Sequence, residues 1–229
     1  RIIKTLLHMH ILSGMLKIWY NTSMILNPKE QRIGFTGDIH GFHKNIIKYS
    51  NRPFKNTNEM NEVIRDRHNA IFDKDDIIFN IGDALLLRSD DSYTQAEDWI
   101  KTFNGKIMYL PGNHESNLNL IRKYWTVMPQ LSEIKVLDEE SEYGNQIIVL
   151  CHYALRVWNK SHYGSWHLFG HSHGSLTNDN GVNMQDYETS FSMDVGVDTN
   201  NYHPYTYEDV KEHMSKKIFI PLDHHTGQH

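Results

Sequence analysis

The chain alternates between short apolar runs and segments with helical periodicity. Five apolar runs end abruptly at a glycine or a polar residue, and they span residues 33–36, 77–81, 107–110, 147–151 and 166–169. Short continuous apolar runs bounded by turn residues are typical of buried strands. We therefore expect five strands in which most side chains are buried.

Helical spacing appears between these runs. Apolar residues recur on one stripe within 60–71, 93–103 and 117–125, which predicts amphipathic helices. Thr57 or Asn58 is the expected N-cap of the first of these helices. A last helix is expected to begin at Thr206, which forms a capping-box pattern with Asp209.

Strands and helices alternate in the first half of the chain, whereas the second half contains a hairpin signal. That signal is Tyr143-Gly144-Asn145, placed between two predicted strands. The order of elements predicts an α/β fold with at least one mixed sheet covered by helices.

Composition narrows the class of protein. The 229 residues are 39% hydrophobic and 22% charged, which excludes a disordered chain, a collagen-like repeat and a multi-span membrane protein. The single cysteine, Cys151, excludes an internal disulfide. We expect Cys151 to be a buried strand residue. We also expect the protein to be cytoplasmic. The formal net charge of −5 gives no basic footprint for a stable nucleic-acid complex.

The two ends of the chain are set apart from the rest. Residues 1–19 are rich in apolar side chains but are interrupted by lysine and histidine, so they are too short for a membrane span and resemble a signal peptide only weakly. We expect an N-terminal extension over 1–30 and a single domain over 31–229. The extension would be either an extra helix or strand, or sequence upstream of a start at Met15. The histidine-rich tail 224–229 is expected to be frayed.

The polar residues with chemical potential follow the predicted strands. The chain has 16 histidines, and several of them belong to five polar clusters that stand just after the five apolar runs. The candidates are Asp38, His40, Asp83, Asn113, His114, His152, His171 and His173. Ligands of open α/β sheets bind at the carboxyl ends of the strands, so we expect these clusters to converge.

Carboxylate, amide and imidazole groups are ligands of borderline divalent metals such as Mn, Fe, Zn, Ni and Co. Eight such groups are more than one metal ion would coordinate. Two ions about 3.5–4 Å apart, joined by a bridging carboxylate, would account for them better. Asp83 is the expected bridge. His114 would be left over as a proton donor, with Glu115 as the group that orients it.

In sequence order, these clusters resemble the motif set of the calcineurin-like metallophosphoesterases. The motifs are Asp38-Ile39-His40, Gly82-Asp83, Gly112-Asn113-His114-Glu115, His152 and Gly170-His171-Ser172-His173. The resemblance spans about residues 31–198. It is nearest to small phosphoesterases of bacteria and phages, because the segments 43–47, 158–166 and 193–198 are also similar.

The resemblance implies a four-layer α/β/β/α sandwich with two mixed sheets, and two metal ions with Mn the most effective in vitro. It assigns Asp38, His40, Asp83 and His173 to the first ion and Asp83, Asn113, His152 and His171 to the second. A hydroxide that bridges the metals would be the nucleophile. His114 would protonate the leaving oxygen as a general acid or stabilise the phosphate, with Glu115 or an aspartate behind it.

One departure bears on the substrate. Phosphoprotein phosphatases of the family continue after Gly-Asp with Asp-Arg-Gly and have arginine before Gly-Asn-His, whereas this chain has Ala84 and Pro111 at the corresponding positions. An arginine clamp for a dianion is therefore missing, which favours phosphodiesters, possible examples being nucleotides or nucleic-acid ends. The expected substrate contacts are Asn113, His114, Arg156 and His43, and Arg88 or Lys160 are further candidates for a cationic contact.

Other interpretations of the sequence stay open. A phosphomonoesterase acting on phosphoproteins or dinucleoside polyphosphates is one alternative, and a non-catalytic scaffold of the same fold is another. Asp194 and Asp198 are candidates for orienting ligand histidines, and His162 for a place near the site. The aromatic residues of 202–207 either pack or stack on a base.

Overall fold

The computed structural model describes residues 24–88, 92–114, 117–141, 143–177, 190–218 and 220. Two five-stranded sheets form the framework. The hairpin sheet has the order β1 (Met24–Leu26), β6 (Leu131–Leu137), β7 (Asn145–Cys151), β8 (Trp166–Phe169) and β9 (Ser192–Asp194). The helix-covered sheet has the order β10 (Tyr205–Thr206), β2 (Ile33–Thr36), β3 (Ile77–Ile81), β4 (Lys106–Leu110) and β5 (Thr126–Val127).

Both sheets are mixed. In the helix-covered sheet β2 to β5 are parallel and β10 is antiparallel to β2. In the hairpin sheet β6 and β7 are antiparallel, and the other neighbours are parallel. The five predicted strands and the hairpin across Tyr143-Gly144-Asn145 are confirmed, and so is the α/β class with two mixed sheets.

Four of the described helices match the predicted helical segments, whereas the first helix along the chain was not predicted. They are α1 (Lys44–Tyr49), α2 (Thr57–Ile71), α3 (Tyr93–Ile100), α4 (Leu118–Tyr124) and α5 (Tyr207–Ser215). The N-cap of α2 is Asn56, not Thr57 or Asn58, because the Asn56 side chain accepts a hydrogen bond from Glu59 N. The capping box of α5 between Thr206 and Asp209 is confirmed.

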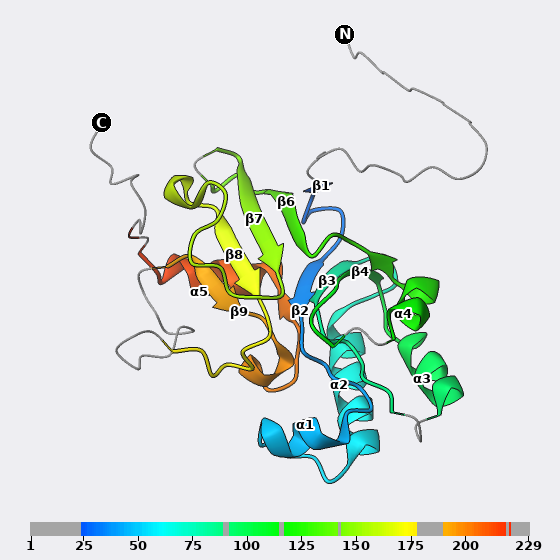
Figure 1. Ribbon diagram of the computed structural model, residues 1–229. Helices are drawn as coiled ribbons and strands as arrows, with labels where there is room; N and C mark the ends of the chain where they lie inside the picture. The colour runs from blue at the N-terminus through cyan, green and yellow to red at the C-terminus, as the bar shows by residue number, and fades with distance from the viewer. Residues whose placement is uncertain are drawn as a thin grey trace, which may run out of the picture.

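Figure 1 shows the layers that the two sheets and the helices form. Two apolar cores lie between these layers. Helices α1–α4 pack on one face of the helix-covered sheet, where Ile78, Ile107 and Tyr109 point towards them. The opposite face of that sheet meets the hairpin sheet, and Phe35, Phe79 and Ile81 pack there against Ile148 and Leu168. Alternation of buried side chains along each strand thus supplies both cores. The two sheets therefore pack face to face, as predicted.

Helix α5 and the loop after β7 complete the layers. Val210 and Met214 of α5 belong to the core between the sheets. On the outer side of the hairpin sheet, Trp158 lies over His167 with ring centroids 5.4 Å apart. Segment 153–165, which includes the 3-10 turn η1 (Ser161–Tyr163), therefore covers part of that face.

Several elements had no signal in the apolar pattern. Strand β1 lies within the range that we expected to be an extension, and it pairs with β6. Strands β9 and β10 are three and two residues long. Cys151 ends β7 and is half-buried, so the expectation of a buried cysteine is wrong. Residues 1–23 and 221–229, which include the histidine tail, lie outside the described residues.

The fold brings strand ends from both sheets together. A parallel bridge joins Gly37, after β2, to Gly196, after β9, and Val197 N donates a hydrogen bond to Gly37 O (3.0 Å). Within the described residues, no helix is long and apolar enough to cross a membrane.

Candidate metal centre

The loops after β2, β3 and β8 place five of the predicted residues in unusual backbone conformations. Asp38, His40, Asp83, His171 and His173 all have a positive φ, between 49° and 67°. This left-handed region is disfavoured for residues other than glycine and is enriched at functional sites. Backbone hydrogen bonds hold the conformation, since Asp38 N donates to Gly82 O and His40 N to Asp83 O. The main chain is therefore shaped to direct these side chains inward.

Asp38, His40 and His173 form the first group of possible ligands. One ligand atom of each lies within 4.8 Å of the others. Asp38 and His40 are 0% and 2% exposed, yet Asp38 Oδ1 and both ring nitrogens of His40 have no hydrogen-bond partner. Buried polar atoms without partners are rare because desolvation is unfavourable. A cation among these atoms would satisfy them.

Asp83 lies between the first group and the second. Its Oδ2 is 3.5 Å from His40 Nε2 and 3.6 Å from His152 Nε2. Its Oδ1 accepts a hydrogen bond from the backbone N–H of His114 (2.9 Å). Asp38, Asp83 and His152 also have ligand atoms within 4.8 Å of one another. Asp83 is thus placed where one carboxylate can serve two ions.

Three ligand atoms of the second group converge on each other. Asn113 Oδ1 lies 2.8 Å from His152 Nε2 and 2.9 Å from His171 Nδ1. The other ring nitrogen of His152 donates to the carbonyl of Ile81 (2.9 Å). This hydrogen bond fixes the tautomer in which Nε2 carries the lone pair, as is usual for metal-binding histidines.

His173 is oriented by a buried ion pair. Asp198 Oδ2 accepts from His173 Nδ1 (2.6 Å), which leaves Nε2 as the ligand atom. Arg52 in turn donates to both carboxylate oxygens of Asp198 and to the carbonyls of Asp38 and Ile39. The expectation that Asp198 orients a histidine agrees with this contact. Arg52 was not predicted, because a single arginine before a proline carries no chemical signature.

The electrostatics of the cluster also favour a cation. Burial raises the pKa of Asp38, and the neighbouring Asp194 and Asp83 raise it further against the opposing effect of His173. Burial and the nearby cationic groups lower the pKa of His40. Burial lowers the pKa of His173, but the hydrogen bond to Asp198 and the charge of Asp38 outweigh it and raise that pKa overall. Divalent cations would relieve both the carboxylate repulsion and the unsatisfied lone pairs.

Two glycines allow the close approach of the backbone to Asp38. A Cβ atom would lie 2.8 Å from Asp38 Oδ2 at Gly170 and 2.6 Å at Gly196. Asp38 Oδ2 instead accepts the backbone N–H of His171 (2.8 Å). The glycine before His171 is therefore required by packing around the carboxylate.

His114 and His43 stand beside the cluster. The rings of His114 and His43 are 5.5 and 5.4 Å from the ring of His40, respectively. His114 is exposed, whereas His43 is 7% exposed and its Nδ1 has no partner. The exposed Tyr153 packs its ring 4.8 Å from His171. These side chains form the rim of the centre. Glu115 lies outside the described residues.

Several further residues were expected near the site. Lys160 lies in a segment that precedes the first residue of β8, so it is not a cationic contact at the strand ends. Arg156 is exposed and makes no hydrogen bond, ion pair or ring contact with any described residue. His162 packs its ring on Tyr163, with the ring centroids 4.2 Å apart. Tyr202, Tyr205 and Tyr207 are buried, so they pack and do not form an exposed stacking surface.

The chain is similar to an archaeal protein and to a bacterial protein of known structure. It is 40% identical to the uncharacterized protein MJ1445 of Methanocaldococcus jannaschii over 86 residues, which cover 37% of this chain and 47% of that protein. The matched part is therefore about half of that relative's length. The crystal structure of the protein of unknown function AQ665 from Aquifex aeolicus has a TM-score of 0.60 and 19% identity, and covers 80% of this chain and 98% of that one. That likeness shows the fold alone.

The family comparison covers most of the chain. The sequence model described as calcineurin-like phosphoesterase matches residues 31–225. That range contains all five strand-end clusters, together with the two groups of possible ligand atoms described above. The protein belongs to the calcineurin-like phosphoesterase family.

Proposed function

We propose that the protein is a metal-dependent phosphodiesterase that uses two divalent cations. Asp38, His40, Asp83 and His173 would hold the first cation. Asp83, Asn113, His152 and His171 would hold the second. The observation that carries the proposal is the set of buried, unpartnered ligand atoms on Asp38 and His40 beside a carboxylate placed between two histidines.

Bound divalent cations supply an activated water and neutralise charge on the phosphate oxygens. The protein's own contribution is positioning. The hydrogen bond from His152 to Ile81 O and that from His173 to Asp198 fix the two imidazoles before any ligand arrives. Preorganised groups lower the barrier because they do not reorient during the reaction.

His114 is the proposed proton donor to the leaving oxygen. Its backbone N–H is anchored on Asp83 Oδ1, and its ring is exposed at the rim. It can therefore face a substrate while remaining 5.5 Å, centroid to centroid, from the ring of His40. A positioned general acid contributes about 10²–10⁴-fold to such reactions. The Asn113 side chain is proposed to contact the phosphate of the substrate at the same edge of the site.

The preference for diesters rests on where the arginines point. Arg52, the arginine nearest to the ligand loops, is buried and directs its guanidinium at Asp198 and two main-chain carbonyls. It cannot also clamp the dianion of a phosphomonoester from the substrate side. A diester carries one negative charge, which bound cations can neutralise without an arginine.

Phosphomonoester hydrolysis is the second candidate, and Arg88 favours it. Burial and His114 lower the pKa of His43, and the charge of Arg88 lowers it further. The charge of Arg88 is thus close enough to the rim to affect the pKa of His43. If its exposed side chain reached the substrate, a dianion could be held.

A hydrolysis panel separates the two candidates. We would assay bis(p-nitrophenyl) phosphate and p-nitrophenyl phosphate in Mn²⁺ with the wild type and Arg88→Gln. Arg122→Gln, which changes another exposed arginine, is the control. A diesterase should prefer the diester by about tenfold or more in kcat/KM, and Arg88→Gln should leave that ratio unchanged. A preference for the monoester that is lost in Arg88→Gln would establish the second candidate instead.

A further inference from the structure

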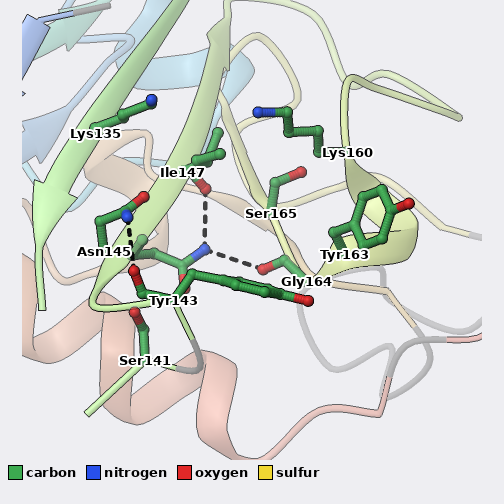
Figure 2. A pocket seen from close by; sticks show the side chains of 10 residues that line it. Lys135, Ser141, Tyr143, Asn145, Ile147, Lys160, Tyr163, Gly164 and Ser165 are labelled. Atoms are coloured by element: carbon green, nitrogen blue, oxygen red, sulfur yellow. Dashed lines mark hydrogen bonds between the residues drawn. The ribbon is translucent and has the colours of Figure 1, made fainter. Parts of the chain in front are cut away.

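A pocket of about 430 Å³ lies away from the metal centre, between the hairpin and the segment before β8. Figure 2 shows its walls, formed by Tyr143 and Asn145 at the hairpin, Lys135 on β6, and Lys160 and Tyr163 at η1. The volume is in the range of small-molecule sites, about 300–1,000 Å³. This pocket is large enough for an organic ligand.

The pocket and the metal centre occupy opposite ends of the same strands. Asn145 and Gln146 begin β7, and Gly164 and Ser165 come directly before β8. The proposed ligands His152 and His171 follow the other ends of these two parallel strands. A ligand in the pocket would therefore bind independently of the metals.

One wall of the pocket is fixed by hydrogen bonds. Gln146 Nε2 donates to Gly164 O (3.0 Å) and to Ile147 O (2.9 Å), drawn as dashed lines in Figure 2. Ser165 Oγ donates to Asn159 O (2.6 Å), and Trp158 Nε1 donates to Ser165 O (3.1 Å). The segment that carries Lys160 and Tyr163 is thus fastened to β7 and to itself.

Two lysines give the pocket a positive charge. The ammonium groups of Lys135 and Lys160 form no ion pair or hydrogen bond with a described residue. Lys160 also has a left-handed backbone, with φ 60° and ψ 21°, which glycine or asparagine would adopt at less cost. Figure 2 shows both side chains extending towards the same end of the pocket. An anion between them would relieve their mutual repulsion.

Two tyrosine rings line the pocket beside these charges. Tyr143 and Tyr163 are 59% and 62% exposed. Exposed aromatic rings in a polar pocket offer faces for stacking, and stacking on a base contributes about 1–3 kcal/mol. The pocket therefore combines a place for an anion with a place for a flat ring.

We propose that this pocket binds a phosphorylated nucleoside, with the phosphate between Lys135 and Lys160 and the base on Tyr143 or Tyr163. The ligand is either a free nucleotide or the terminal nucleotide of a strand, since both present the same ring and phosphate. The site is separate from the proposed phosphodiesterase centre and does not depend on it.

The test is a titration of the full, ¹⁵N-labelled chain in EDTA, so that the metal centre holds no cation. AMP, adenosine, inorganic phosphate and a 5′-phosphorylated tetranucleotide would be added separately and followed by amide shifts. AMP should shift amides of 143–147 and 160–165 and bind about tenfold or more tightly than adenosine or phosphate alone. If the tetranucleotide binds at these amides and AMP does not, the source is a strand end.

Variants decide whether the named residues make the site. Lys135→Gln with Lys160→Gln should weaken AMP about tenfold or more, because two charge-assisted contacts are lost. Lys74→Gln, an exposed lysine elsewhere, should change nothing. The proposal is overturned if none of the four ligands shifts the pocket amides, if adenosine or phosphate binds as well as AMP, or if the double variant keeps wild-type affinity. Equal melting temperatures of the variants would show that folding is intact.

Discussion

Two buried histidines with the same exposure have opposite environments. His40 and His68 are each 2% exposed. His68 lies among Phe72 and Phe103 and donates from Nε2 to Asn104 O (2.8 Å), whereas neither ring nitrogen of His40 has a hydrogen-bond partner. His167, which is 0% exposed, resembles His68, since Val149 O and Leu155 N satisfy both of its nitrogens.

This difference separates structural histidines from candidate ligands. Burial alone does not mark a functional group, because the main chain can satisfy a buried imidazole completely. Lone pairs left without partners, next to carboxylates and on left-handed backbone, mark the strand-end cluster. Substitutions at the two classes of histidine, and at the carboxylates beside them, test this difference.

The largest effect is expected at the carboxylate between the two groups. Asp83→Asn should lower kcat/KM by about 10³-fold or more, because the amide cannot neutralise two cations. Metal content should fall in parallel. Asp76→Asn is the matched control, since Asp76 is also a buried aspartate but pairs with Arg32. Normal turnover in Asp83→Asn would remove its bridging role.

The next effect tests the histidine comparison directly. His40→Leu should lower activity about 10²-fold or more and leave the stability of the metal-free protein unchanged or higher, because the two unsatisfied ring nitrogens are removed. His68→Gln should keep kcat and lower the free energy of unfolding by about 1–3 kcal/mol. Urea unfolding in EDTA and turnover in Mn²⁺ measure both quantities. The distinction fails if the two variants behave alike.

A smaller effect is expected from the ion pair behind His173. Asp198→Asn should weaken metal affinity about 10–100-fold by removing the carboxylate that orients the imidazole. Competition with a metal-sensitive dye gives the affinity, and Asp66→Asn is an exposed control. Full turnover should return at high Mn²⁺ if Asp198 only positions His173. Unchanged affinity would contradict that role.

The smallest effect is a pH dependence of stability. Burial lowers the pKa values of His68 and His167 to about 4. The unfolded chain therefore binds more protons between pH 6.5 and 4, so stability contributed by each neutral histidine is present above pH 6.5 and is lost as the pH falls towards 4. His68→Gln should reduce the slope of unfolding free energy against pH in this window. An unchanged slope would mean that His68 is not held neutral.

The sequence predicted most of the framework because apolar periodicity reports burial directly. The runs that became β2, β3, β4, β7 and β8 bury nearly every side chain, so they are unambiguous. Strand β1 has three residues and depends on pairing with β6 for its conformation. Such a short strand leaves no periodic signal.

The candidate site was predictable in residue type and order, but not in its supporting contacts. Gly82-Asp83 and Gly112-Asn113-His114 carry a local signature. Arg52 reaches Asp198 across 146 positions of sequence, and no local pattern indicates such a contact. The sequence likewise does not reveal that Lys160 lies away from the carboxyl ends of the strands. Its position depends on the path of the loop that carries it.

The most direct test of the metal centre is the anomalous diffraction of crystals grown with Mn²⁺. Two peaks should appear, one among Asp38, His40 and His173 and one among Asn113, His152 and His171, with Asp83 between them. Absence of anomalous density from this cluster, in crystals with millimolar Mn²⁺ and intact side chains, would contradict the account.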